Sequence, residues 1–271
     1  MTQFRPATLD ELTIDDRPSM MGVAIYQRLE TFVRRSAHRF LIPSEGRQVS
    51  WDRALFLNLT YWNAEAGADL LCDDHIPADV VAHVGWHELA SGELARRAAV
   101  PRTAPSAPAL FFAESIASAF DLYLVGRLLP HFPDSDFIAT QVPLMAECAG
   151  DAGLSETAFQ ALLEEVARAP ERAFEDLRAL LFDAAGALVA CHTATAAQAA
   201  LGGLCDRRFA PLLHHYQLSN WILYARAYAA RTPGPDPIVS GLDQTLREAP
   251  VSLDWLDQHW LEPALARPAG G

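Results

Sequence analysis

The sequence predicts a mainly α-helical, multi-helix globular domain, with a small β element expected only near residues 54–62. Two observations carry this prediction. Apolar residues recur at helical spacing through most of the chain, and segments containing proline and glycine separate the periodic stretches. In addition, the chain has 271 residues, of which 51% are apolar, and this is enough to build a sizeable core.

The N-terminal part has the fewest helical signals. Residues 1–17 are polar and are expected to form a flexible arm, and residues 18–39 then show a helical pattern. Residues 43–47 contain Pro, Ser and Gly and predict a loop. The stretch 54–62, ALFLNLTYW, fits either a strand or a helix, and its aromatic and β-branched ending mildly favours a strand.

Two long helices are predicted next. The first spans residues 77–97, where Pro77 suits the first turn and Asp79 suits the positive end of the helix dipole. Residues 100–108 contain three prolines and predict a loop, and the second helix spans 109–129. Because the loop is short, the two helices are expected to be antiparallel neighbours.

The rest of the chain is predicted to be helical, at 136–149, 155–169, 170–190, a short segment ending at Gly202-Gly203, and 207–231. Residues 18–231 are therefore expected to form one helical domain, with a metal-site half at 18–130 and a helical half at 131–231. Residues 231–237, RTPGPDP, predict a linker. In the tail, 232–271, a helix at 252–261 would dock on the body of the protein, on a partner or on a second copy.

Composition limits the classes of function. The net charge is −13 and basic residues are scattered, so nucleic-acid binding is not expected. The longest apolar runs are far shorter than the roughly 20 residues that a membrane span needs. The N-terminus lacks the apolar core of a signal peptide. The four cysteines form no CxxC pair and are interpreted as buried thiols in a reducing compartment, which predicts a cytoplasmic location.

The functional prediction rests on His83 and His87. Four residues apart on a helix, their imidazoles share one face about a turn apart, a geometry that clamps a metal ion. A helical wheel places both on the inward stripe of the helix at 77–97. Two inward imidazoles either bind a metal or are bonded within the core to carbonyls or carboxylates, because leaving them unsatisfied is costly.

The helix at 109–129 offers a third ligand. Glu114 and Asp121 lie on one face of that helix, on the same side as its core residues. Folding the hairpin about residues 102–104 brings Asp121 level with the histidines and leaves Glu114 about a turn away. A salt bridge to a neighbouring arginine is the alternative role for these carboxylates.

HVGWHELAS followed by AESIASAFD resembles the gluzincin type of zinc metallopeptidase, in which HExxH on one helix is followed by a glutamate ligand on the next. The resemblance covers about 45 residues. It implies a zincin-like metal-binding helix pair, with Zn²⁺ as cofactor and Glu114 as third ligand.

The chain departs from that motif in one position. Read from His87, the second histidine of HExxH is replaced by Ser91, and read from His83, the acid has moved to Glu88. Glu88 lies one turn beyond the position of the usual general base. It is therefore a repositioned base, a metal ligand or a structural residue.

Three functions follow. The first is a metal-dependent hydrolase, peptidase-like, acting on a small-molecule or peptide substrate, with Glu88 as the catalytic residue. The second is a non-haem iron oxidase or oxygenase, because two histidines and one carboxylate also bind Fe²⁺, with His214 or His215 as an additional ligand. The third is a catalytically inactive helical interaction protein with a degenerate metal site.

Overall fold

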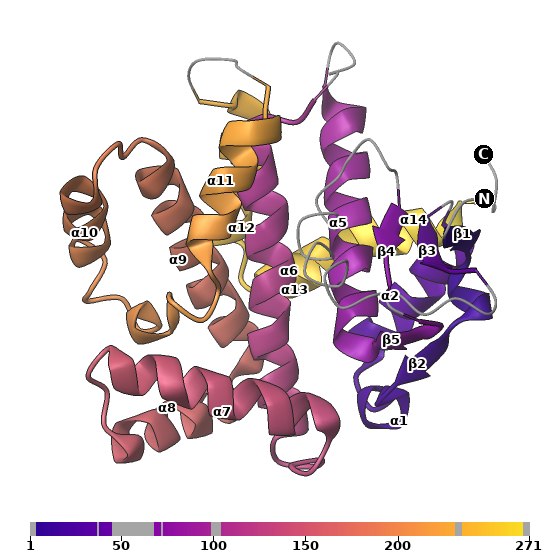
Figure 1. Ribbon diagram of the computed structural model, residues 1–271, viewed down its shortest axis with the longest axis horizontal. Coiled ribbons are helices and arrows are strands. Elements are labelled where there is room, and N and C mark those ends of the chain that lie inside the picture. The colour runs from indigo at the N-terminus through magenta and orange to yellow at the C-terminus, as the bar shows by residue number, and fades with distance from the viewer. Residues whose placement is uncertain are drawn as a thin grey trace. The chain divides into compact units, whose positions relative to one another are not determined.

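The computed structural model describes residues 4–36, 38–44, 68–71, 73–98, 104–230 and 235–267, and these are mainly helical, as the sequence predicts (Figure 1). The predicted β element at 54–62 lies outside them. The chain divides into two compact units, Met1–Glu88 with Leu261–Gly271, and Leu89–Trp260. The boundary falls within a single helix, α5 (Ala78–Arg97).

Short strands form in the first unit where the sequence predicted a flexible arm. β1 (Phe4–Ala7) is antiparallel to β3 (Arg39–Pro43), which is in turn parallel to β4 (Ala68–Leu70). β2 (Thr13–Asp15) is parallel to β5 (His75–Pro77). The arm prediction was wrong because these pairings are made with residues far along the chain, and a polar composition does not show them.

The helix predicted at 18–39 is also interrupted. It is divided into α1 (Arg17–Met20) and α2 (Ala24–Arg35), and the segment from Arg39 belongs to β3. A buried carboxylate holds the two helices together: Glu30 accepts from Arg17 Nε at 2.9 Å and from Arg34 Nε at 2.9 Å. A pair of guanidinium groups compensates for the desolvation of this carboxylate.

The core of the first unit joins the strands to α2 and to the N-terminal half of α5. Its buried side chains are Ala7, Leu9, Leu12, Val33, Phe40, Ile42, Ile76, Val81 and Val84. Gly85 lets α5 approach α2 closely, because a Cβ there would lie 3.2 Å from Leu29 Cδ2. This close packing fixes the part of α5 that carries the histidine pair.

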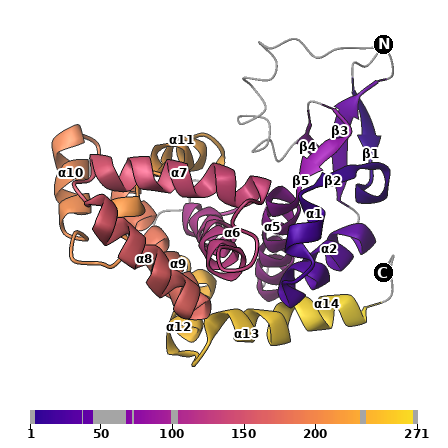
Figure 2. The same cartoon turned by 90° about the horizontal axis from the view of Figure 1, so that it is seen from below.

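The second unit is a bundle built around α6 (Ala107–Leu128). Its other helices are α7 (Asp136–Asp151), α8 (Glu156–Arg168), α9 (Pro170–Val189), α10 (Ala194–Gly202), α11 (Leu218–Tyr228), α12 (Pro237–Glu248) and α13 (Ser252–Leu256). Figure 2 shows α6 end-on, with α7, α8, α9 and α11 around it, and all of them pack on it. α6 is long and apolar enough to cross a membrane, and 89% of its most apolar stretch of 18 residues is buried in the structure.

A buried arginine joins two helices of this bundle. Arg178 on α9 is fully buried and donates to Glu175 Oε1 at 2.6 Å and to Asp243 Oδ1 at 2.9 Å. Its guanidinium carbon also lies 5.9 Å from the ring centroid of Phe112 on α6. Because both partners are carboxylates, they directly compensate the buried positive charge of Arg178.

Two sequence predictions in the C-terminal half were wrong. The helix predicted at 207–231 begins only at Leu218, after turns and η2 (Ala210–Leu212), because Gln217 has a left-handed φ of 47°. In addition, α12 was interpreted as part of the linker and tail. Asp236 caps it by accepting from the backbone N–H of Ile238 at 3.1 Å, and Pro237 is at its first position.

The cysteine prediction is also corrected. Cys148 and Cys191 are half-buried and Cys205 is exposed, so these three thiols are not core residues, and Cys72 lies outside the described residues.

Candidate metal centre

The N-terminal half of α5 brings His83 and His87 together. Their Nε2 atoms are 3.2 Å apart, and their ring centroids are 4.8 Å apart with an angle of 34° between the planes. Both side chains are half-buried, between the buried residues Ala82 and Val84 on one turn and Trp86 on the next. The two Nε2 atoms are therefore on the same face of α5 and within hydrogen-bonding distance of each other, and the shared face is what their spacing predicts.

The surroundings of His83 favour the neutral ring. Burial, together with the nearby charge of His87, lowers the pKa of His83 well below its usual range. A neutral imidazole keeps a lone pair on one nitrogen, and this is the form that binds a metal.

Glu88 has a partner that the sequence did not reveal. His38 Nδ1 donates to Glu88 Oε1 at 3.2 Å. This hydrogen bond is the largest cause that lowers the pKa of Glu88, and burial opposes it. Glu88 is thus ionised at neutral pH, and its side chain remains 42% exposed.

His38 precedes β3, fifty residues before Glu88, and lies edge-on to Phe40 with 4.9 Å between ring centroids. Its side chain is only 10% exposed. No local motif connects it to α5. Only the burial of β3 against the N-terminal half of α5 explains why the two residues meet.

Glu114 and Asp121 both belong to α6, in the second unit. Glu114 is 2% exposed and its charge contributes to raising the pKa of Tyr224, after the larger effect of burial. Asp121 is half-buried, and its charge adds to the burial that raises the pKa of Tyr216 well above its usual range. Each carboxylate therefore lies near a tyrosine of the segment that contains α11, a pairing that the sequence did not predict.

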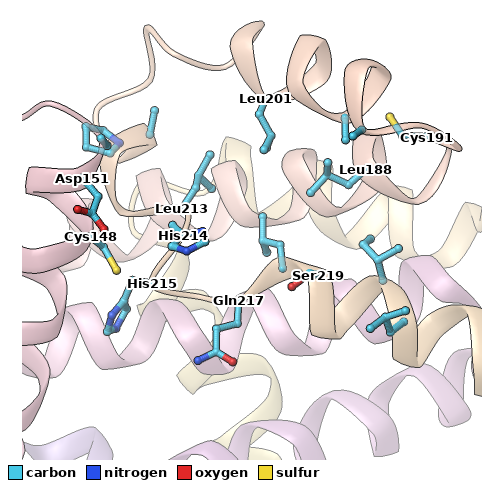
Figure 3. Close-up of a pocket in the computed structure, with 18 of the residues that line it drawn as sticks. Cys148, Asp151, Leu188, Cys191, Leu201, Leu213, His214, His215, Gln217 and Ser219 are labelled. Atoms are coloured by element: carbon cyan, nitrogen blue, oxygen red, sulfur yellow. The ribbon is translucent and has the colours of Figure 1, made fainter.

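His214 and His215 lie between η2 and α11, where they line a groove of the second unit (Figure 3). His214 is exposed, whereas His215 is half-buried and burial lowers its pKa. Both residues therefore lie in turns and not on the helix that the sequence predicted, and burial alone distinguishes them.

Comparison of the chain with protein-family models, with curated proteins and with solved structures finds no match.

Proposed function

We propose that this protein is a metal-dependent hydrolase, peptidase-like in its site, and that His83, His87 and a carboxylate hold a zinc ion. The single observation that carries the proposal is the 3.2 Å separation of the two Nε2 atoms. Two nitrogen ligands of a tetrahedral zinc ion, each about 2.0–2.1 Å from it, lie about 3.3 Å apart. The separation of the two nitrogen atoms is thus compatible with coordination of one zinc ion by both rings.

We assign the third position to Glu114. Each of the three residues offers one ligand atom of a kind that zinc accepts. Glu114 is almost fully buried in an apolar helix, and a carboxylate in such a place needs a cation or hydrogen-bond donors. Asp121, which is half-buried, is the alternative ligand on the same helix.

A bound zinc ion would supply Lewis acidity that lowers the pKa of a water molecule towards about 7. Glu88 is the proposed general base, because its carboxylate is ionised and accessible one residue after His87. Its lowered pKa makes it a weak base, and we therefore expect the hydrogen bond from His38 to lengthen or break when substrate binds. The substrate class proposed is a peptide or a small amide.

The proposal is tested by hydrolysis of a fluorogenic peptide library. We expect activity that a zinc chelator abolishes and added Zn²⁺ restores. His87→Ala should remove it, and Glu88→Gln should reduce it about 10²–10⁴-fold. His259→Ala is the matched control, because this exposed histidine bonds to the carbonyl of Trp255 and stacks on its ring, and takes no part in the proposed site. Full activity of His87→Ala would rule the proposal out, and full activity of Glu88→Gln would remove Glu88 as base.

The same donor set supports a second function. Two histidines and one carboxylate also hold Fe²⁺ in oxidases and oxygenases, so the ligand types alone do not select zinc. Iron bound in place of zinc, together with consumption of O₂, would favour this alternative over hydrolysis.

A further inference from the structure

The second unit contains an open groove that the proposed metal chemistry does not use. We call it the α7–α11 groove. It has a volume of about 1530 Å³ and is bordered by α7, the end of α9, α10, η2 and α11 (Figure 3). Its apolar lining includes Leu144, Leu188, Leu201, Leu213, Ile222 and Leu223.

Apolar side chains stay exposed along this groove. Leu144 on α7 is 47% exposed and Leu223 on α11 is 64% exposed, and both line it. α10 has no buried residue, although Ala194, Ala197 and Leu201 present a helical stripe to the groove. Apolar residues gathered around one concavity indicate a binding surface, because a partner would remove them from water.

Two acidic side chains lie at one end of the groove, where a cation would be attracted. Glu147 and Asp151 lie in the last turns of α7, at the negative end of its dipole, and that helix has no basic residue in its last turn. Neither carboxylate has an ion pair or hydrogen bond with any residue that the structure describes. Two acids at this end of a helix repel its carbonyl groups.

The end of α9, which also borders the groove, shows the opposite arrangement. Arg226 of α11 donates to the carbonyl oxygen of Cys191 at 2.6 Å, just beyond that helix. A guanidinium thus lies by the end of α9, whereas no basic side chain of the described residues pairs with the two carboxylates in the last turns of α7. Figure 3 shows Asp151 and Cys191 at opposite ends of the groove.

We propose that the α7–α11 groove docks a basic amphipathic helix of a partner protein. A helix of three turns, about 16 Å long and about 10 Å wide, occupies about 1300 Å³ and matches the groove in size. Typical small-molecule pockets, of about 300–1,000 Å³, are smaller and enclose their ligand. The apolar face of the helix would cover Leu144 and Leu223, and its lysines or arginines would lie against Glu147 and Asp151.

A second copy of this chain suits the groove less well. The chain has a net charge of −13, so a second molecule would bring further negative charge towards the acidic end. A partner of opposite charge gains from the same field.

The test uses a fluorescein-labelled peptide of 18 residues with leucines at helical spacing on one face and lysines on the other. Binding to the full chain is followed by fluorescence anisotropy. We expect saturable binding, weakened at least tenfold by Leu223→Glu and by the double variant Glu147→Lys, Asp151→Lys. A peptide with glutamates in place of the lysines should not bind.

Two matched controls separate the groove from general attraction to an acidic protein. Phe132→Glu changes another exposed apolar residue, 44% exposed and outside the groove, and Glu164→Lys reverses an exposed acid on α8. Both should bind the peptide within twofold of the unaltered chain, and circular dichroism should show unchanged helicity in all variants.

Three results would overturn the proposal. The first is loss of binding that is equal in control and groove variants, or no binding at all. The second is self-association of the unaltered chain, in analytical ultracentrifugation, that Leu223→Glu abolishes, because the occupant would then be a second copy. The third is displacement of the peptide by dodecylamine at equal concentration, because a single lipophilic cation would then fill the groove.

Discussion

Gly126 on α6 is a position where one added methyl group should destabilise the bundle that carries both candidate carboxylates. A Cβ built at Gly126 would lie 2.8 Å from the carbonyl oxygen of Val166 and 2.8 Å from Cβ of Pro170. Neither neighbour moves away by rotating a side chain, because one is backbone and the other belongs to a ring. Gly126→Ala must therefore push apart α6 and the junction of α8 with α9.

The size of the effect follows from two opposing contributions. Alanine in place of glycine inside a helix favours folding by about 1 kcal/mol. Overpacking of a close contact costs about 1–3 kcal/mol, and the two short contacts at Gly126 indicate the upper part of this range. We expect Gly126→Ala to lower the free energy of unfolding by about 1–2 kcal/mol.

Gly186 on α9 is the matched control, because a Cβ there meets no atom within 4 Å. Gly186→Ala should raise the free energy of unfolding by about 0.4–1 kcal/mol, so the two variants should shift in opposite directions. Urea denaturation followed by circular dichroism measures both. Equal stabilisation by the two substitutions would refute the close packing of α6 on the α8–α9 junction.

Two further predictions concern charged residues. Arg178→Met removes the guanidinium that pairs with Glu175 and one of the two that pair with Asp243, which keeps Arg247. Because neither carboxylate is left both fully buried and unpaired, stability in thermal unfolding should fall by about 1.5–3 kcal/mol, and a loss below about 0.5 kcal/mol would contradict this. His38→Ala removes the hydrogen bond that lowers the pKa of Glu88, so NMR titration should find that pKa higher. In the unaltered protein the pKa of Glu88 is lower in the folded state than its unfolded value of about 4.3, and this difference stabilises the fold at pH values above 4.3. The stabilisation is lost as the pH falls through the pKa of the folded state. Stability of His38→Ala should therefore depend less on pH in that range, whereas His259→Ala should leave it unchanged.

Much of the helical content was predictable because it depends on local signals. The periodic apolar stripes of α8 and α9, with Ser155 as a cap and Pro170 at a first position, identify those helices from sequence alone. The long helices α5 and α6 were also placed within two residues at each end. Here the burial of an apolar face and the local propensity favour the same structure.

The errors in the N-terminal part occur where distant segments decide the structure, and those in the C-terminal half have local causes. β1 and β2 pair with residues more than thirty positions away, and nothing within 1–17 indicates those partners. The segment before Leu218 has an apolar composition that suits a helix, but Pro211 and the left-handed Gln217 turn it. Asp236 and Pro237 form a helix start that sequence alone could have identified. The helix was not predicted, because these two residues were assigned to the proline-rich linker.

In the candidate site, too, contacts set by local spacing were predictable and contacts between distant residues were not. Spacing predicts that His83 and His87 converge, because four residues on a helix fix their relative position. The contact of His38 with Glu88 was not predictable, because it joins residues fifty positions apart. The tyrosines near Glu114 and Asp121 belong to α11 and the turn before it, and their approach depends on how these pack on α6.

The central claim is that His83 and His87 hold a metal ion. The most direct measurement is the metal content of the full chain, purified without a polyhistidine tag or chelator, by inductively coupled plasma mass spectrometry. We predict about one zinc ion per chain, lost in His83→Ala and in His87→Ala and retained in His259→Ala, with helicity unchanged in all three. Absence of bound metal in the unaltered chain, or full retention of zinc in both site variants, would contradict the account.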